Sequence, residues 1–250
     1  INSDAYNEEE ETNYLIDDAE KKIFSVTKAR KAGEFKSIAS VMKSAQEQIE
    51  KLAKNQNEIT GLATGFYDLD KLTSGLHENE LIIVAARPAM GKTAFALNLA
   101  VNAASKSDKA VALFNLEMSA EQLAMRMIAA AGGIEMNKVR TGRLEHNDWK
   151  KVNEAMSELS ETNLYIEDNA GMTISEIRAK CRRLATSDKG LGLIVIDYLQ
   201  LISGSSKNEG NRVQEVSEIS RSLKTMAMEL KVPVVALAQL SRSVELRENK

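Results

Sequence analysis

The feature that most constrains the fold is a segment in which an apolar run leads through a small loop into a helical pattern. Residues 81–86 (LIIVAA) are apolar, and a helical pattern continues from the loop through residue 100. The turn between them consists of Ala86, Arg87, Pro88, Ala89, Met90, Gly91, Lys92 and Thr93. Strand, loop and helix in this order are the context of a P-loop, whose backbone wraps around phosphate groups. The segment therefore predicts an α/β fold with a nucleotide site at this turn.

The residue types in the turn suit the binding of a nucleotide together with Mg²⁺. Gly91 lets the backbone approach the phosphates, and the helix that follows offers free N–H groups and the positive end of its dipole. Lys92, expected as an exposed loop residue, supplies a positive charge to the β- and γ-phosphates, and the Thr93 hydroxyl coordinates Mg²⁺. Ala86 departs from the consensus, which has glycine at this position. The plainer alternative is a helix that merely opens with Gly-Lys-Thr.

Polar residues also follow three other apolar runs, where a sheet would end. The residues are Asp197, Glu117 and Gln239, after the runs 193–196, 110–116 and 234–238. Asp197 is predicted as a second anchor for Mg²⁺. Glu117 is predicted, in a partly desolvated position, as the base that activates water, and Gln239 as a hydrogen-bond partner of the γ-phosphate. Each residue also has a plainer reading as an ordinary polar residue at the end of a strand.

From Gly61 onward, short apolar runs alternate with amphipathic helical patterns. The apolar runs are 81–86, 110–116, 193–196 and 234–238. Near-continuous apolar strands between amphipathic helices predict a mostly parallel sheet that is flanked by helices on both faces. Two pairs have the spacing of capping boxes at helix starts, Ser119 with Gln122 and Thr173 with Glu176.

Apolar stripes at helical spacing predict which helix faces lie on the core. The stripes are Trp149, Val152, Met156 and Leu159; Ile174, Ile177, Cys181 and Leu184; and Val216, Ile219, Leu223, Met226 and Leu230. Because Cys181 and Trp149 both lie on such stripes, we expect a core thiol rather than a nucleophile, and a core indole rather than a platform for stacked bases. His77 and His146 are isolated and lack the spacing of metal ligands.

The first 58 residues have a different pattern and are predicted to be a linker region, followed by a domain over residues 59–250. Residues 1–13 are polar and acidic, which is typical of a linker. Apolar residues at helical spacing then predict helices over 14–30 and from Ile38 to Leu52. Each apolar stripe must be covered either by the following domain or by a neighbouring subunit.

Charge and cysteine content exclude several classes of protein. The 33 basic and 36 acidic residues give a net charge of -3, so that any contact with DNA must come from a local patch. The single cysteine excludes a disulfide framework and favours a reducing cytoplasm. The longest apolar runs are too short to cross a bilayer, and no membrane partner is expected.

Five segments together resemble the DnaB family of bacterial and phage replicative helicases. They are AARPAMGKT, LFNLEMS, VIDYLQLI, EISRSLK and VPVVALAQLSR, and the resemblance covers roughly residues 14–250. It implies a RecA-like P-loop ATPase core preceded by a helical linker, and a homohexameric ring with ATP and Mg²⁺ between subunits. It also implies translocation along single-stranded DNA, with a primase and a helicase loader as partners.

The resemblance assigns a role to each residue that matches a family motif. Lys92 and Thr93 match the Walker A pair, Asp197 the Walker B acid, Glu117 the catalytic glutamate and Gln239 the γ-phosphate sensor. The predicted helix over 14–30 looks like the linker helix that docks on the adjacent subunit.

Two parts of the family pattern are not in this sequence. The N-terminal helical domain does not precede Ile1, and the arginine finger of the family belongs to sequence that follows Lys250. We therefore expect this chain to bind Mg-ATP but to hydrolyse it very poorly.

The sequence allows two readings of the loop over 203–212 and two alternative functions for the chain. Lys207 and Arg212 are candidates for contacts with DNA phosphates, because RecA-like motors place a loop here toward the central channel; a solvated surface loop is the alternative. The other functions are those of a RecA-type recombinase and of an ATP-binding assembly module without catalysis. The linker helix and the Arg-Pro pair inside the P-loop favour the helicase.

Overall fold

The computed structural model describes residues 35, 37–54, 59–203 and 212–240. The predicted helix over 14–30 and Lys207 lie outside this part of the chain. Arg212 is the first residue of a described helix, but its side chain is not described. The chain divides into two compact units, residues 1–57 and 58–250, and each is described by itself.

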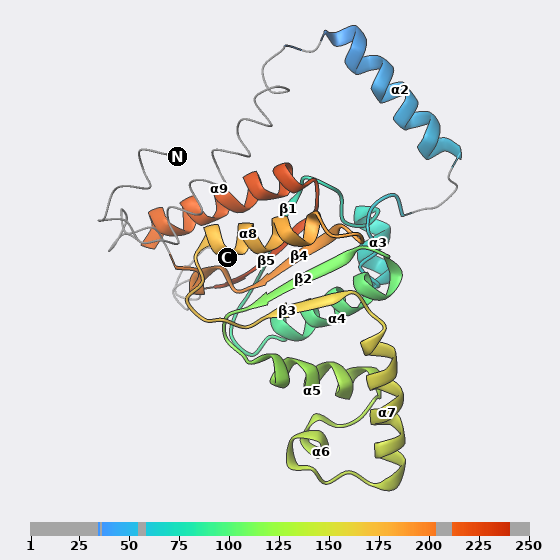
Figure 1. Cartoon of the computed structure of the whole chain (residues 1–250), viewed down its shortest axis with the longest axis vertical. Coiled ribbons are helices and arrows are strands. Elements are labelled where there is room, and N and C mark those ends of the chain that lie inside the picture. The colour runs from blue at the N-terminus through green and yellow to red at the C-terminus, as the bar shows by residue number, and fades with distance from the viewer. Residues whose placement is uncertain (1–34, 36, 55–58, 204–211, 241–250) are drawn as a thin grey trace, which may run out of the picture. The chain divides into compact units, whose positions relative to one another are not determined.

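A five-stranded sheet forms the centre of the second unit (Figure 1). Its strands are β1 (Leu81–Ala86), β2 (Ala110–Asn115), β3 (Leu164–Glu167), β4 (Leu191–Asp197) and β5 (Val234–Gln239). They lie in the order β1-β5-β4-β2-β3, and every adjacent pair is parallel. The predicted α/β fold with a mostly parallel sheet is confirmed. The edge strand β3 was not predicted, because its sequence LYIE offers only three consecutive apolar residues between polar neighbours.

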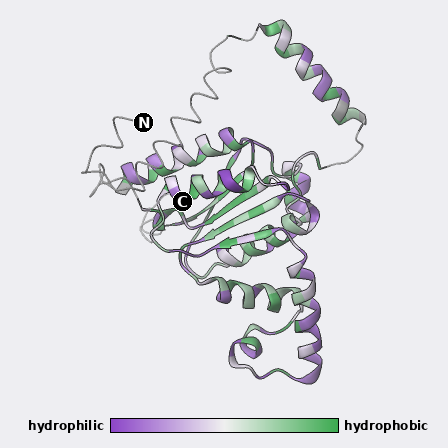
Figure 2. Ribbon diagram, viewed as in Figure 1, coloured by the Kyte–Doolittle hydropathy of each residue, from purple (hydrophilic) through white to green (hydrophobic). Residues whose placement is uncertain are grey.

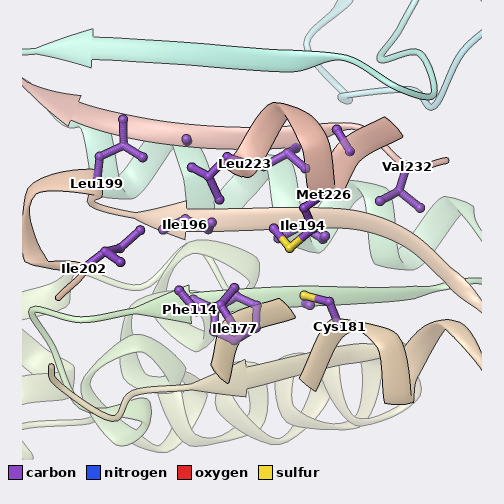
Figure 3. Close-up of a cluster of buried hydrophobic side chains, with 14 of the residues drawn as sticks. Phe114, Ile177, Cys181, Ile194, Ile196, Leu199, Ile202, Leu223, Met226 and Val232 are labelled. Carbon is purple, nitrogen blue, oxygen red and sulfur yellow. The ribbon is translucent and has the colours of Figure 1, made fainter. Parts of the chain in front are cut away.

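Helices cover both faces of this sheet, as Figure 1 shows. On one face lie α8 (Ile174–Ala185) and α9 (Arg212–Leu230), and on the other lie α4 (Lys92–Lys106) and α5 (Ala120–Ala131). Alternate side chains of β4 enter the two cores: Ile194 and Ile196 pack on the α8 and α9 side, shown in Figure 3, while Val195 packs on the other side. Both faces of the central strands are therefore apolar, and Figure 2 colours these strands green.

Two helices begin at the capping boxes that the sequence predicts. The Ser119 side chain accepts from the backbone N–H of Gln122 at the start of α5, and Thr173 does the same for Glu176 at α8. Each box satisfies two backbone donors, and loss of such an N-cap costs about 1 kcal/mol. The start of each helix is therefore defined by its capping box.

The α8 stripe is buried as predicted. Ile177 and Cys181 are both fully buried against the sheet. Burial raises the pKa of the Cys181 thiol to about 12, so the thiol stays neutral at physiological pH. The interpretation of Cys181 as a core residue is confirmed.

The α7 stripe differs from its prediction. Helix α7 (His146–Ser160) follows α6 (Met136–Thr141) and packs against α5, and most of it extends away from the sheet (Figure 1). Val152 is buried there, but Trp149 and Met156 are 53% and 51% exposed. The placement of these two residues in the core was wrong, because a helix that covers another helix buries a narrower face than one that lies on a sheet.

A buried carboxylate organises the segment that leads into β1. Helix α3 (Tyr67–Thr73) carries Asp70, which accepts hydrogen bonds from the Thr64 N–H at 2.8 Å, the Thr64 hydroxyl at 2.7 Å and the Gly65 N–H at 3.1 Å. Burial raises the pKa of Asp70, but these hydrogen bonds and the charge of Lys106 outweigh it, so the pKa lies below its ordinary value of 3.8. Gly65 is required here, since its φ is +82° and a Cβ would lie 2.2 Å from the Asn102 amide.

The first unit contributes helix α2 (Ile38–Lys54), as the sequence predicts. Its apolar residues, which include Ile38, Met42 and Ile49, are exposed. Among the described residues, no helix is long and apolar enough to cross a membrane.

Candidate nucleotide-binding site

The predicted P-loop is formed between β1 and α4. Strand β1 ends at Ala86, α4 begins at Lys92, and Gly91 is the N-cap with a φ of +85°. A Cβ on Gly91 would meet nothing within 4 Å, so glycine is needed for the backbone conformation and not for space. Ala89 also has a positive φ of 63°, which costs an L-residue about 1 kcal/mol or more. The turn directs the free N–H groups of the first helical turn toward the loop, the arrangement that binds anions.

A cavity of about 340 Å³ opens at this turn. Its lining residues are Arg87, Pro88, Ala89, Gly91, Lys92, Thr93, Ala94, Glu117, Met118, Arg126 and Gln239. The structure thus brings the P-loop, Glu117 and Gln239 to one place, although they come from three different strand ends. Ala86 ends β1 at this edge, and Met90 is 72% exposed on the outer side of the loop. Arg126 reaches the same cavity from α5, and no sequence pattern had marked it.

Asp197 lies under the P-loop at the end of β4 and is 1% exposed. The Thr93 hydroxyl donates to its Oδ2 at 2.6 Å, and the Lys92 ammonium lies 3.8 Å from its Oδ1. Oδ1 is buried and has no hydrogen-bond partner among the described residues. A buried carboxylate oxygen beside a hydroxyl is the kind of donor set that Mg²⁺ uses, with phosphate and water completing the coordination. These residues therefore fit the cation that the sequence predicts.

Lys92 is less exposed than the sequence predicts. Its side chain is 10% exposed, and the ammonium lies 4.4 Å from the centre of the Tyr198 ring as well as close to Asp197. The expectation of an exposed loop lysine was wrong, because the carboxylate and the aromatic face both attract the ammonium.

Asn115 is a site residue that sequence reasoning missed. It is 1% exposed at the end of β2, and its Nδ2 donates to Asp197 Oδ2 at 3.3 Å. Its Oδ1 accepts from the N–H groups of Glu117 at 3.1 Å and Met118 at 2.7 Å. One amide therefore joins the buried carboxylate to the turn that carries Glu117. An amide at the end of an otherwise apolar run was the only signal for it.

The remaining predicted residues lie at the same edge of the sheet. Glu117 is exposed at the cavity, so the partly desolvated position expected for a base is not present in the single chain. Gln239 ends β5 as the register partner of Ala86 and is also exposed. Hence the chain brings the predicted site residues together at one edge of the sheet, around a cavity that is open to solvent.

Comparisons with known proteins agree with this geometry. Residues 61–250 match the family described as DnaB-like helicase C terminal domain. Over all 250 residues the chain is 53% identical to the replicative DNA helicase DnaB of Geobacillus stearothermophilus and 52% identical to the replicative DNA helicase DnaC of Bacillus subtilis. It spans 55% of the length of each of these relatives.

Two solved structures share the fold. One is the structure of an ATPase domain that is 39% identical, with a TM-score of 0.79 over 86% of this chain and 75% of that one. A DnaB-like replicative helicase, solved together with its interactions with primase, is 36% identical, with a TM-score of 0.76 over 92% of this chain and 55% of that one. The RecA-like P-loop fold and the resemblance seen in the five motifs are thereby confirmed, and this chain belongs to the DnaB-like helicase C-terminal domain family.

Proposed function

We propose that the chain is the ATP-hydrolysing motor of a replicative DNA helicase, which couples hydrolysis to translocation on single-stranded DNA and to duplex unwinding. The observation that carries this proposal is the contact between Thr93 and the buried Asp197 at 2.6 Å, beside a cavity that Thr93 lines together with Lys92 and Glu117. A hydroxyl, a buried carboxylate, a lysine and a second acid are the set of groups that phosphoryl transfer requires.

Each predicted site residue takes one task in this proposal. Lys92 leaves Asp197 and binds the β- and γ-phosphates of ATP, since two negative groups at the cavity compete for one ammonium. Thr93 and Asp197 supply oxygen atoms for Mg²⁺, which when bound neutralises charge that develops on the phosphates. Glu117 accepts a proton from the attacking water, and Gln239 donates a hydrogen bond to the γ-phosphate. The residues 86–93 form the cradle around the phosphates.

The exposure of Glu117 supports a site that is completed by another copy of the chain. A base works best where solvent is partly excluded, and here the cavity is open. The described part of the first unit leaves the apolar residues of α2 without a cover, and we propose that a neighbouring subunit provides it. We therefore extend the proposal to a homohexameric ring in which the linker helix expected over residues 14–30 docks on the adjacent subunit.

Partners outside the chain are also part of the proposal. Single-stranded DNA is expected in the channel of the ring, with Lys207 and Arg212 as candidate phosphate contacts. A primase is proposed as a partner because a similar solved helicase interacts with one. A helicase loader is proposed from the family resemblance alone.

The test compares Glu117→Gln with Glu121→Gln, in a protein of the relatives' full length that contains this chain. Glu121 is an exposed acid in the first turn of α5, so its change is a matched control. Glu117→Gln is expected to keep ATP affinity and to lower DNA-stimulated hydrolysis and strand displacement at least about 100-fold. Normal hydrolysis in this variant would refute the role of Glu117. Nucleotide binding without any DNA-stimulated hydrolysis in the unaltered protein would favour the assembly module.

A further inference from the structure

Strands β4 and β5 separate just before they reach the candidate site. Their pairing runs from Ile194 beside Val234 to Ile196 beside Ala236. Beyond this point β5 continues to Gln239 with only β1 as a paired strand, where Ala86 is the register partner of Gln239. The chain after Asp197 turns instead into the short helix η2 (Leu199–Leu201).

Beside the last residue of β5, where β4 no longer pairs with it, the side chain of Gln200 in η2 makes the backbone contacts instead. Its Nε2 donates to the carbonyl oxygen of Gln239 at 3.1 Å, and its Oε1 accepts from the N–H of Gln239 at 3.2 Å. A single amide thus satisfies both backbone groups of Gln239, the pattern that a neighbouring strand would provide. On the other side the N–H of Leu240 donates to the carbonyl of Ala86 at 3.1 Å.

The turn that carries Gln200 is itself anchored. Leu199 and Ile202, on either side of it, are 4% and 2% exposed and point into the core in Figure 3. Gln239, by contrast, is an exposed residue at a strand end, where the backbone would be free to fray without a second partner. Gln200 therefore ties the last residue of β5 to a turn that is packed into the core.

We propose that Gln200 is a positioning residue that holds Gln239 where its side chain can distinguish ATP from ADP. The inference rests on the proposed role of Gln239 as the partner of the γ-phosphate. It adds that this role depends on a two-point contact from the segment directly after Asp197. The γ-phosphate sensor and the Mg²⁺ anchor are then linked through Gln200 and respond together to a movement of η2.

Equilibrium binding of two nucleotides to the chain tests the inference without the need for hydrolysis. The probes are ADP and a non-hydrolysable ATP analogue, both with Mg²⁺, and the variants are Gln200→Met, Gln239→Ala and the double variant. Methionine keeps the length of the side chain and removes both hydrogen bonds. We expect Gln200→Met to lower the preference for the ATP analogue about three- to tenfold, the range of a hydrogen bond between neutral groups, with ADP affinity unchanged. The double variant should show the same preference for the ATP analogue as Gln239→Ala alone.

The outcomes separate this inference from the proposed function. If Gln239→Ala keeps the preference, the role of Gln239 itself is wrong. If Gln239→Ala lowers the preference and Gln200→Met does not, or if the two losses add in the double variant, the inference is overturned. Equal weakening of both nucleotides, together with a lower melting temperature, would show that Gln200 is merely structural. If Gln200→Met does not fold, Gln200→Glu, which keeps the acceptor and loses the donor, takes its place with the same criteria.

Discussion

Helices α7 and α8 are both amphipathic, but they lie in different surroundings. Helix α8 lies on the sheet and fully buries Ile177 and Cys181, whereas α7 packs on α5 and leaves Trp149 and Met156 about half exposed. Two regions of the molecule therefore differ: the sheet with its directly packed layers, and the helical region α6–α7. Periodicity shows that a helix has an apolar face, but the area that this face buries depends on the surface it meets.

The largest expected effect is the difference in the free energy of unfolding between a variant of α8 and a variant of α7. Ile177→Ala removes a fully buried side chain between α8 and the sheet and should lower the free energy of unfolding by about 2–5 kcal/mol. Met156→Ala, on the exposed side of α7, should change it by less than about 0.5 kcal/mol. Urea unfolding of both variants measures the difference. Similar losses in the two variants would show that α7 belongs to the same core.

The next effect concerns nucleotide affinity. Lys92→Ala should weaken the binding of Mg-ATP about 10- to 100-fold, because a charged contact to the phosphates is lost. Arg140→Ala removes an exposed cation of α6 and should leave the affinity within about twofold. The circular dichroism spectrum of Lys92→Ala should keep its native form. An equal effect of Arg140→Ala would mean that overall charge, and not the P-loop, attracts the nucleotide.

A third prediction compares two carboxylates by how their contributions to the free energy of unfolding depend on pH. Folding lowers the pKa of Asp70, so the ionised carboxylate stabilises the folded state. This contribution is fully present above the ordinary pKa of 3.8 and is lost as the pH falls through the lower pKa of the folded state. Asp70→Asn should therefore cost about 1–3 kcal/mol at pH 7, and this difference should vanish in strong acid. The measurement is the free energy of unfolding of both proteins from pH 7 down to pH 2.

Asp148 in α7 is the matched comparison for Asp70. Its pKa is also lowered, first by the hydrogen bond from Lys138 and then by the N–H of Glu145, but the pair lies at the surface of the helical region. Asp148→Asn should have the smaller effect, and added salt should weaken it, which is not expected for Asp70. A salt-dependent effect at Asp70 would contradict its buried position.

The smallest effect is a spectroscopic one. Trp149 is the only tryptophan and is 53% exposed, so that its fluorescence should be readily quenched by acrylamide in the native chain. Nucleotide should leave this quenching unchanged in the single chain, since Trp149 lies in α7 and does not line the cavity at the P-loop. A protected, blue-shifted emission would show that α7 is covered after all.

The residues that carry the site were largely predictable, and the contacts that hold them were not. A polar residue directly after a buried run of a parallel sheet must emerge at the carboxyl edge, which is why Asp197, Glu117 and Gln239 could be placed together. Asn115 and Gln200 act through partners 82 and 39 residues away in the chain, and no local pattern records such pairs.

By itself, the sequence determined the α/β class, the P-loop, the two capping boxes and the apolar strands, because each is a local pattern of residue type and spacing. The tertiary structure decided the rest: the edge strand β3, how much of its apolar face α7 buries, and the position of Lys92 beside Asp197. These depend on which surfaces meet when distant segments pack, and on charges that only folding brings within 4 Å of each other. Periodicity fixes the direction of a side chain relative to its own helix or strand, and only packing decides what that side chain touches.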